Sequence, residues 1–99
     1  MRKLEWSPDT LEDLDVIWMY IAEDSVERAS TFVEELQAQA RKLIDAPRTG
    51  VVIPEINDEM FRGKYYKGYT IVYEIRQDGI RVHEVYNQHR IFIRTYNRP

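Results

Sequence analysis

Residues 60–96, MFRGKYYKGYTIVYEIRQDGIRVHEVYNQHRIFIRTY, decide the fold of this chain. β-Branched and aromatic residues alternate there with polar ones, a pattern that is typical of strands. Lys67-Gly68 separates two such runs, and Asp78-Gly79 is a strong signal for the two-residue turn of a hairpin. The stretch therefore predicts strands at 59–66, 69–76 and 80–86, followed by a last strand or turn of helix at 91–96.

Two amphipathic helices are predicted upstream of these strands. Ser7-Pro8 is typical of a helix start, with serine as the N-cap and proline at the first helical position. Ser25 is predicted to cap the second helix, and Pro47 is predicted to end it. The residues expected on the buried faces are Leu11, Leu14, Ile17, Trp18 and Ile21 in a helix over about 8–23, and Ala29, Phe32, Val33, Leu36, Ala40, Leu43 and Ile44 in the next.

The order of these elements predicts the α+β class. Residues 2–6 and 51–53 have the pattern of short strands, the second of them at an edge. Because few residues separate the two helices, we expect them to form an antiparallel hairpin. The predicted architecture is a short N-terminal strand and a helical hairpin packed on a mostly antiparallel sheet, with residues 1–99 as a single domain.

Composition excludes several classes of protein. The chain has no cysteine, which excludes disulfides, thiolate metal sites and a cysteine nucleophile. No apolar run approaches the length of a bilayer-spanning helix, and the N-terminus lacks the apolar segment of a secretion signal. We therefore expect a cytoplasmic protein that has no membrane partner.

The net charge of −3 hides a division along the chain. Residues 1–58 carry a charge of −7 and residues 59–99 carry +4. Affinity for nucleic acid depends on clustered cations, so a net-acidic chain is a poor general binder of phosphate. Only the second half has the cations for a local basic face, whereas the acidic first helix offers a surface to a basic or amphipathic partner.

Motifs that bind cofactors are missing from the sequence. No phosphate loop, dinucleotide fingerprint or metal-ligand cluster is found, so neither a cofactor nor a metal ion is expected. Of the two histidines, His83 is mid-strand and His89 is the better functional candidate. Arg62, Lys64 and Arg90 lie among tyrosines, a combination that can stack on bases and bind phosphate. The alternative is that these tyrosines and cations are ordinary strand residues.

Short motifs along nearly the whole chain carry a family resemblance. They are Trp6-Ser7-Pro8, Asp13-Leu14, Ile17, Tyr20-Ile21, Glu27-Arg28-Ala29, Phe32, Leu43, Pro47, Gly50, Val52-Ile53-Pro54-Glu55, Phe61-Arg62, Tyr69 to Tyr73, and Val85 to Arg90. In this order they resemble the RelE/ParE superfamily of bacterial toxins from type II toxin–antitoxin modules, and the ParE branch most closely. The resemblance implies a helical hairpin on a twisted sheet, growth arrest, a role in plasmid stabilisation, and an antitoxin that covers the helices and a sheet edge.

The two branches of the superfamily imply different activities. ParE-like members are regarded as inhibitors of DNA gyrase, whereas RelE-like members cut messenger RNA in the ribosomal A site with basic residues and a C-terminal tyrosine. Matched by position, Arg90 and Tyr96 keep two of the RelE groups. Thr70, Phe61 and Gly63 stand in place of an arginine and two lysines. Because one electrostatic stabiliser is worth about 10²–10³ in rate, these losses disfavour an enzyme.

The leading hypothesis is a toxin that inhibits gyrase by binding, without a reaction of its own. Its functional surface is predicted at Arg62, His89 and Arg90. The alternative is a ribosome-dependent mRNA endoribonuclease in which Lys64, Arg90 and Tyr96 take modified catalytic roles.

A third reading is an interaction module that has lost its toxicity. Thr70 and Val51 favour it, because relatives commonly carry arginine at both positions.

Overall fold

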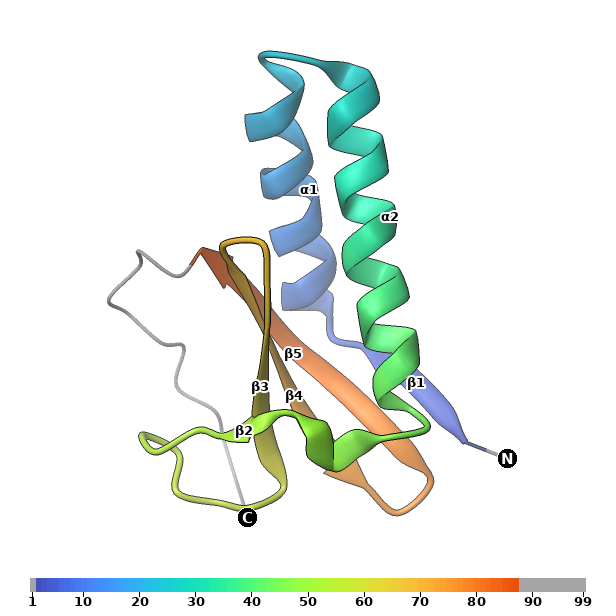
Figure 1. Ribbon diagram of the computed structural model, residues 1–99, viewed down its shortest axis with the longest axis vertical. Helices are drawn as coiled ribbons and strands as arrows, with labels where there is room; N and C mark the ends of the chain where they lie inside the picture. The colour runs from blue at the N-terminus through green and yellow to red at the C-terminus, as the bar shows by residue number, and fades with distance from the viewer. Residues whose placement is uncertain (1, 88–99) are drawn as a thin grey trace.

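The elements of the chain follow the predicted order (Figure 1). The computed structural model describes residues 2–87, so the strand or helical turn predicted at 91–96 lies outside the described residues. The elements are β1 (Lys3–Trp6), α1 (Pro8–Ala22), α2 (Val26–Leu43), the 3-10 turn η1 (Pro47–Thr49), β2 (Val51–Val52), β3 (Phe61–Tyr66), β4 (Tyr69–Arg76) and β5 (Gly79–Asn87).

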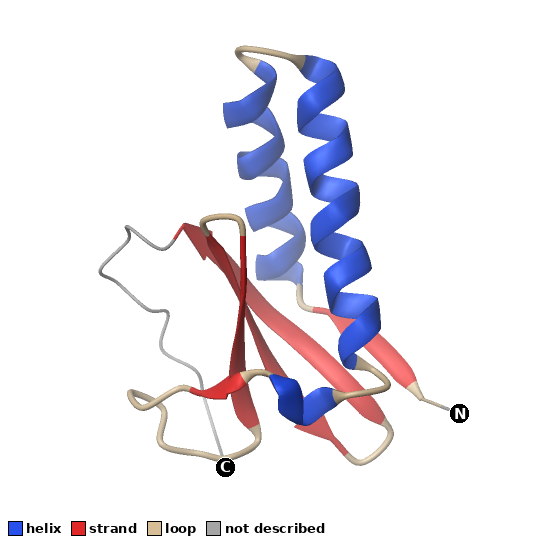
Figure 2. Ribbon diagram, viewed as in Figure 1, coloured by secondary structure: helices blue, strands red, loops and turns tan. Residues whose placement is uncertain are grey.

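The five strands form one sheet in the order β1-β5-β4-β3-β2. β1 is parallel to β5, and each of the other neighbours is antiparallel. Both helices pack on the same face of the sheet, and the turn between them projects well beyond it (Figure 2). The predicted helical hairpin on a mostly antiparallel sheet is confirmed, as is the α+β class.

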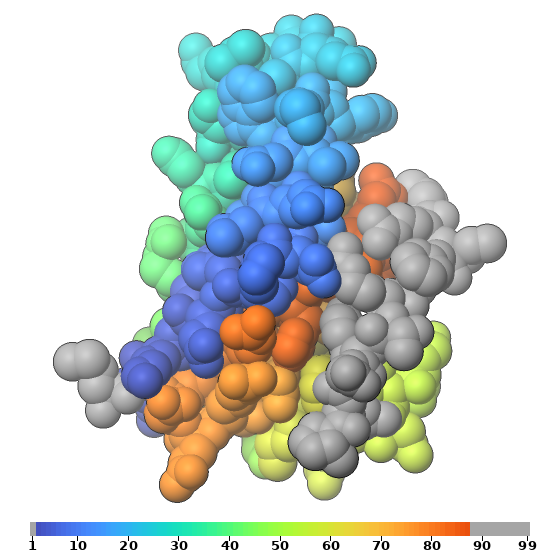
Figure 3. Space-filling view, turned by 180° about the vertical axis from the view of Figure 1, so that it is seen from behind, coloured from blue at the N-terminus to red at the C-terminus, as the bar shows by residue number. Residues whose placement is uncertain are grey.

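Strand β5 is hydrogen-bonded along both edges, although β1 pairs only with its first four residues, Gly79 to Val82. Beyond β1, polar groups at the start of α1 continue the contact. The Ser7 N–H and the Thr10 hydroxyl donate to the Val82 carbonyl over 3.0 and 2.9 Å. The Val85 N–H donates to Asp13 Oδ2 over 3.0 Å. Viewed from behind, α1 accordingly lies directly against β5 (Figure 3).

Both predicted N-caps are confirmed. Ser7 Oγ accepts from the Thr10 N–H, and Ser25 Oγ accepts from the Arg28 N–H, each over 3.1 Å. Such caps stabilise a helix by about 1 kcal/mol. The core that the helices close against the sheet contains Leu14, Ile17, Leu36, Ala40, Leu43, Ile71, Tyr73, Ile80, Val82 and Val85.

Leu11 was predicted on the buried face of the first helix, and this prediction is wrong because its side chain is 50% exposed. Thr10, Leu14 and Ile17 point toward the sheet. Successive residues of a helix are about 100° apart, so Leu11 turns away from the face that Thr10 defines.

The β3–β4 turn matches its prediction. Tyr66 pairs with Tyr69, and the two residues between them, Lys67 and Gly68, have φ values of 45° and 89°. Two positive φ values in a two-residue loop are typical of a type I′ turn, whose twist suits a hairpin.

The β4–β5 turn lies one residue earlier than predicted. Arg76 pairs with Gly79, so Gln77 and Asp78 form the turn and Gly79 already belongs to β5. Glycine is needed there for a different reason, because a Cβ on Gly79 would lie 1.9 Å from the Lys3 carbonyl oxygen of β1. Asp-Gly is therefore correct as a hairpin signal and wrong as the pair of turn residues.

We expect Gly79→Ala to destabilise the fold more than Gly68→Ala. Both glycines have positive φ, 154° and 89°, so alanine at either position is strained, at a cost of about 1–3 kcal/mol. Only at Gly79 would the added carbon also collide with β1, since nothing lies within 4 Å of a Cβ on Gly68. Urea denaturation measures both losses, and equal losses would contradict the close approach of β1 to Gly79.

Candidate functional site

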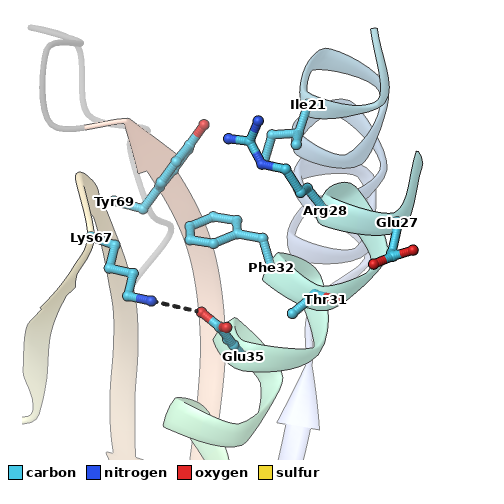
Figure 4. Close-up of a pocket in the computed structure, with 8 residues that line it drawn as sticks. All are labelled: Ile21, Glu27, Arg28, Thr31, Phe32, Glu35, Lys67 and Tyr69. Atoms are coloured by element: carbon cyan, nitrogen blue, oxygen red, sulfur yellow. Dashed lines mark hydrogen bonds and ion pairs between the residues drawn. The ribbon is translucent and has the colours of Figure 1, made fainter. Parts of the chain in front are cut away.

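A groove of about 400 Å³ lies between α2 and the β3–β4 hairpin. Figure 4 shows that α2 forms one wall and that residues at the hairpin turn form the other. The lining residues are Ile21, Glu27, Arg28, Thr31, Phe32, Glu35, Lys67 and Tyr69. We call this the α2–β3 groove.

Aromatic rings form the base of the α2–β3 groove. Phe32 of α2 stacks against Tyr66 with ring centroids 6.1 Å apart and meets Tyr69 at 5.4 Å. Tyr66 and Tyr69 are cross-strand partners on either side of the type I′ turn, so the turn sets the positions of both rings. The groove thus offers apolar surface at a fixed place between a helix and a hairpin.

Glu35 ties the hairpin turn to α2. Its Oε1 accepts from the Tyr66 hydroxyl over 2.7 Å and from Lys67 Nζ over 3.2 Å. The Tyr66 hydrogen bond, followed by that of Lys67, lowers the pKa of the Glu35 carboxyl, which stays ionised at neutral pH. Because this ion pair is open to solvent, it contributes little to stability and serves mainly to position the turn.

Arg28 is the unpaired cation of the groove. Its guanidinium makes no ion pair within the described part of the chain, and it extends over Phe32 toward the Tyr69 hydroxyl (Figure 4). The two lining carboxylates do not neutralise it: Glu35 is engaged by Lys67, and Glu27 points away from the rings (Figure 4).

Arg62, a predicted surface residue, instead fastens the loop around η1 and β2. Its Nε donates to the Glu59 carbonyl over 2.9 Å, and its Nη1 donates to the carbonyls of Gly50 and Arg48 over 3.1 and 3.3 Å. Three backbone carbonyls therefore hold this guanidinium, and its main visible role is to position the loop.

The buried Tyr73 completes this loop attachment from the core. Its hydroxyl donates to the Pro47 carbonyl and accepts from the Gly50 N–H, the latter over 3.0 Å. Burial raises the pKa of the Tyr73 phenol, against the opposing effects of the Gly50 hydrogen bond and the Arg62 charge. Pro47, which was predicted to end the second helix, opens η1 at this point, while α2 already ends at Leu43.

The sheet face opposite the helices brings together the positions that the family resemblance compares with nuclease groups. Phe61 and Gly63, two residues apart on β3, lie on the same face of the sheet. A Cβ on Gly63 would lie 3.1 Å from Thr70 Cγ2 of β4. Gly63 thus lies between Phe61 and Thr70 on this face, and none of the three carries a charge. On the same face Glu74, the cross-strand partner of Phe61, is bonded to Arg76 over 3.1 Å and to His83 over 2.9 Å. Glu84 is fully buried.

The predicted site residues are not assembled by the described residues into one cluster. Lys64 pairs with the buried Ile71, so it lies on the helix side of the sheet, opposite to Thr70. His89, Arg90 and Tyr96 lie outside the described residues.

Sequence reasoning missed the groove itself, because its lining comes from segments about 40 residues apart. The one local signal was the tight Lys67-Gly68 turn with a tyrosine on each side. That turn fixes one wall, but the opposite wall depends on how α2 packs.

Between residues 2 and 87, no group of three or more histidine, aspartate or glutamate side chains is arranged to hold a metal ion. None of the described helices is long and apolar enough to cross a membrane.

Comparisons with known proteins identify a family. The family model described as "ParE toxin of type II toxin-antitoxin system, parDE" matches residues 4–92. Among solved structures, the chain is similar to the "Chromosomal ParDE TA system from P. aeruginosa", with a TM-score of 0.70 and 19% sequence identity over 88% of this chain and 96% of that chain. At this identity the similarity shows the fold alone. No curated protein matches the chain in sequence.

We expect Tyr73→Phe to destabilise the protein by about 1–3 kcal/mol, because the substitution leaves the buried Gly50 N–H and Pro47 carbonyl without their partner. Tyr65→Phe is the matched control, since Tyr65 is 57% exposed and the loss there should stay within about 0.5 kcal/mol. Urea denaturation of both variants measures the difference. A Tyr73→Phe variant as stable as the control would show that the hydroxyl does not hold the loop.

The raised pKa of Tyr73 predicts a loss of stability at alkaline pH. In the unfolded chain the phenol ionises near pH 10, whereas in the folded protein it ionises only at higher pH. Its contribution is therefore complete below about pH 10 and declines as the pH rises toward the folded pKa. Unfolding free energies measured at a series of alkaline pH values should fall more steeply for the wild-type protein than for Tyr73→Phe. Parallel curves would contradict this assignment.

Proposed function

Because the chain belongs to the ParE toxin family of type II toxin–antitoxin systems, we propose that it arrests growth by binding DNA gyrase and that a cognate antitoxin neutralises it. The family model covers residues 4–92, which supports a single toxin domain over residues 1–99. Gyrase and a cognate antitoxin are both encountered in the cytoplasm, which is the location that we propose.

The observation that carries a binding mechanism is the chemistry of the sheet face opposite the helices. Cleavage of RNA needs a proton acceptor for the 2′-hydroxyl and cations for the charge that develops on phosphorus. Phe61, Gly63 and Thr70, the positions that the resemblance compares with nuclease cations, supply no cation. Without cations at these positions the charge that develops on phosphorus is not stabilised there, which favours a toxin that acts by occupying its target.

The α2–β3 groove is the proposed seat of the antitoxin. It joins apolar rings to an unpaired guanidinium, a combination that suits a peptide segment with both apolar and polar side chains. A second contact is proposed on α1, where Val16, Met19 and Tyr20 are 57%, 57% and 70% exposed. Exposed apolar side chains that lie together mark interaction surfaces.

The gyrase contact is proposed to involve His89 and Arg90. Arg62 would support it indirectly, since its guanidinium is occupied by the carbonyls of Arg48, Gly50 and Glu59 and holds the loop before β3.

We expect the purified protein, in stoichiometric excess, to inhibit supercoiling by purified gyrase, and addition of the antitoxin to restore it. Substitution of both His89 and Arg90 by alanine should weaken inhibition by about tenfold or more, because charged contacts at an interface typically contribute 1–3 kcal/mol. Lys3→Gln is the matched control, since Lys3 pairs with Asp78 at the far edge of the sheet. The readout is the fraction of plasmid left relaxed.

Supercoiling that is unchanged at excess toxin would overturn the gyrase proposal. The same protein should then be added to a translating extract and the message mapped by primer extension. Cuts in the ribosomal A site that disappear in Arg90→Ala and Tyr96→Phe would establish the nuclease alternative instead.

A further inference from the structure

The cations of the described residues fall into two groups. Five of them pair with carboxylates: Arg2 with Asp45, Lys3 with Asp78, Lys67 with Glu35, Arg76 with Glu5 and Glu74, and Arg81 with Glu5. The others make no ion pair within residues 2–87, and all of them belong to α2, η1 and β3: Arg28, Arg41, Lys42, Arg48, Arg62 and Lys64. Among the described residues, the cations without an ion pair are therefore confined to these three elements.

Helix geometry places some of these cations along the α2–β3 groove. Arg28, Glu35 and Lys42 are spaced seven residues apart on α2, which is close to two helical turns, so they share one flank. Glu35 reaches Tyr66 and Lys67, which shows that this flank faces the β3–β4 hairpin. Lys42 thus extends the line of Arg28 and Glu35 toward the C-terminal end of α2.

Strand geometry places Lys64 on the opposite wall. Alternate residues of a strand share a face, so Lys64 lies on the same side of β3 as Tyr66, whose hydroxyl bonds Glu35. Strand β2 pairs only with Arg62 and Gly63. On this edge of β3, opposite to β4, no strand among the described residues pairs beyond Gly63.

The charges along this line are unequal. Of the two carboxylates that line the groove, Glu35 is already engaged by Lys67 and Tyr66, and Glu27 points away from the rings (Figure 4). Arg28, Lys42 and Lys64 make no ion pair within residues 2–87. In a chain whose net charge is −3, this local excess of cations is complementary to an anionic partner.

We propose that the α2–β3 groove and its extension to Lys42 and Lys64 bind an acidic segment of the antitoxin. One carboxylate of the segment meets Arg28, an apolar side chain packs on Phe32 and Tyr69, and further carboxylates lie near Lys42 and Lys64. This inference rests on the proposed function, because the partner is the antitoxin of the same module. Beyond that function, the inference states that the antitoxin segment is acidic and names the toxin residues that bind it.

A peptide fits this surface better than a nucleic acid. The aromatic rings line a groove of about 400 Å³ between a helix and a hairpin, which admits side chains. A duplex backbone laid along α2 would meet Glu27, which lines the groove, and Glu34, which is exposed to solvent. Repulsion from these carboxylates opposes phosphate, whose binding depends on clustered cations.

The test measures the affinity of the full-length toxin for the antitoxin encoded in the neighbouring reading frame, at low and high salt. We expect Arg28→Gln, Lys42→Gln and Lys64→Gln each to weaken binding about threefold to tenfold, and the triple variant about 100-fold. Arg28→Lys should retain part of the affinity, since it keeps the charge. The matched control is Lys3→Gln, which removes a cation that already has a partner and should change affinity less than twofold.

The salt dependence supplies a second readout. The triple variant should lose affinity less steeply with added salt than the wild-type toxin does, because fewer charge contacts remain to be screened. Circular dichroism melting curves verify that each variant is folded before binding is measured.

Three outcomes would overturn the inference. If the antitoxin binds all variants as tightly as it binds the control, these cations do not contact an acidic segment, and the proposed function stands. If the antitoxin does not bind the wild-type toxin at all, the proposed function fails with it. If the variants keep antitoxin binding but lose affinity for a short DNA duplex, the surface recognises nucleic acid instead.

Discussion

The whole structure depends on strand β5 being hydrogen-bonded along both edges. One edge is covered by β4, and the other is shared between β1 and the first two turns of α1. A buried backbone group without a partner costs about 1–3 kcal/mol, so Thr10 and Asp13 replace a strand that ends too early. Their side chains fix the position of α1 on the sheet, the short turn after α1 fixes α2, and α2 forms one wall of the groove. The α2–β3 groove is therefore positioned by hydrogen bonds at the opposite end of the helical hairpin.

Local patterns were sufficient for most of the fold. Ser7 and Ser25 predicted the helix starts, and the tyrosines around Lys67-Gly68 predicted a tight hairpin, because caps and turns depend on neighbours in the sequence. The displaced β4–β5 turn could not be predicted in this way. Gly79 is required by the backbone of Lys3, which is remote in sequence and becomes a neighbour only when β1 pairs in parallel.

The candidate site was harder to predict for the same reason. Arg62 was predicted to be functional because it is a cation among tyrosines. In the structure, its guanidinium donates to three backbone carbonyls from separate segments and so positions the loop. Lys64 was considered for catalysis, and the register of β3 places it on the other face of the sheet from Thr70. Arg28 was not predicted to be a functional cation. Its local sequence does not show that the nearby Glu35 pairs with Lys67 instead of with Arg28.

Among the described residues, cations that form ion pairs and cations that form none lie on different elements. Ion pairs fasten β1, the β4–β5 turn and the β3–β4 turn, whereas Arg28, Lys42 and Lys64 hold nothing in place. Exposed side chains of the second kind can usually be exchanged at a cost within about 0.5 kcal/mol. Duplicated copies of such a gene could therefore diverge at these positions without unfolding. Each copy would then acquire its own antitoxin, and related modules could coexist in one cell without neutralising one another.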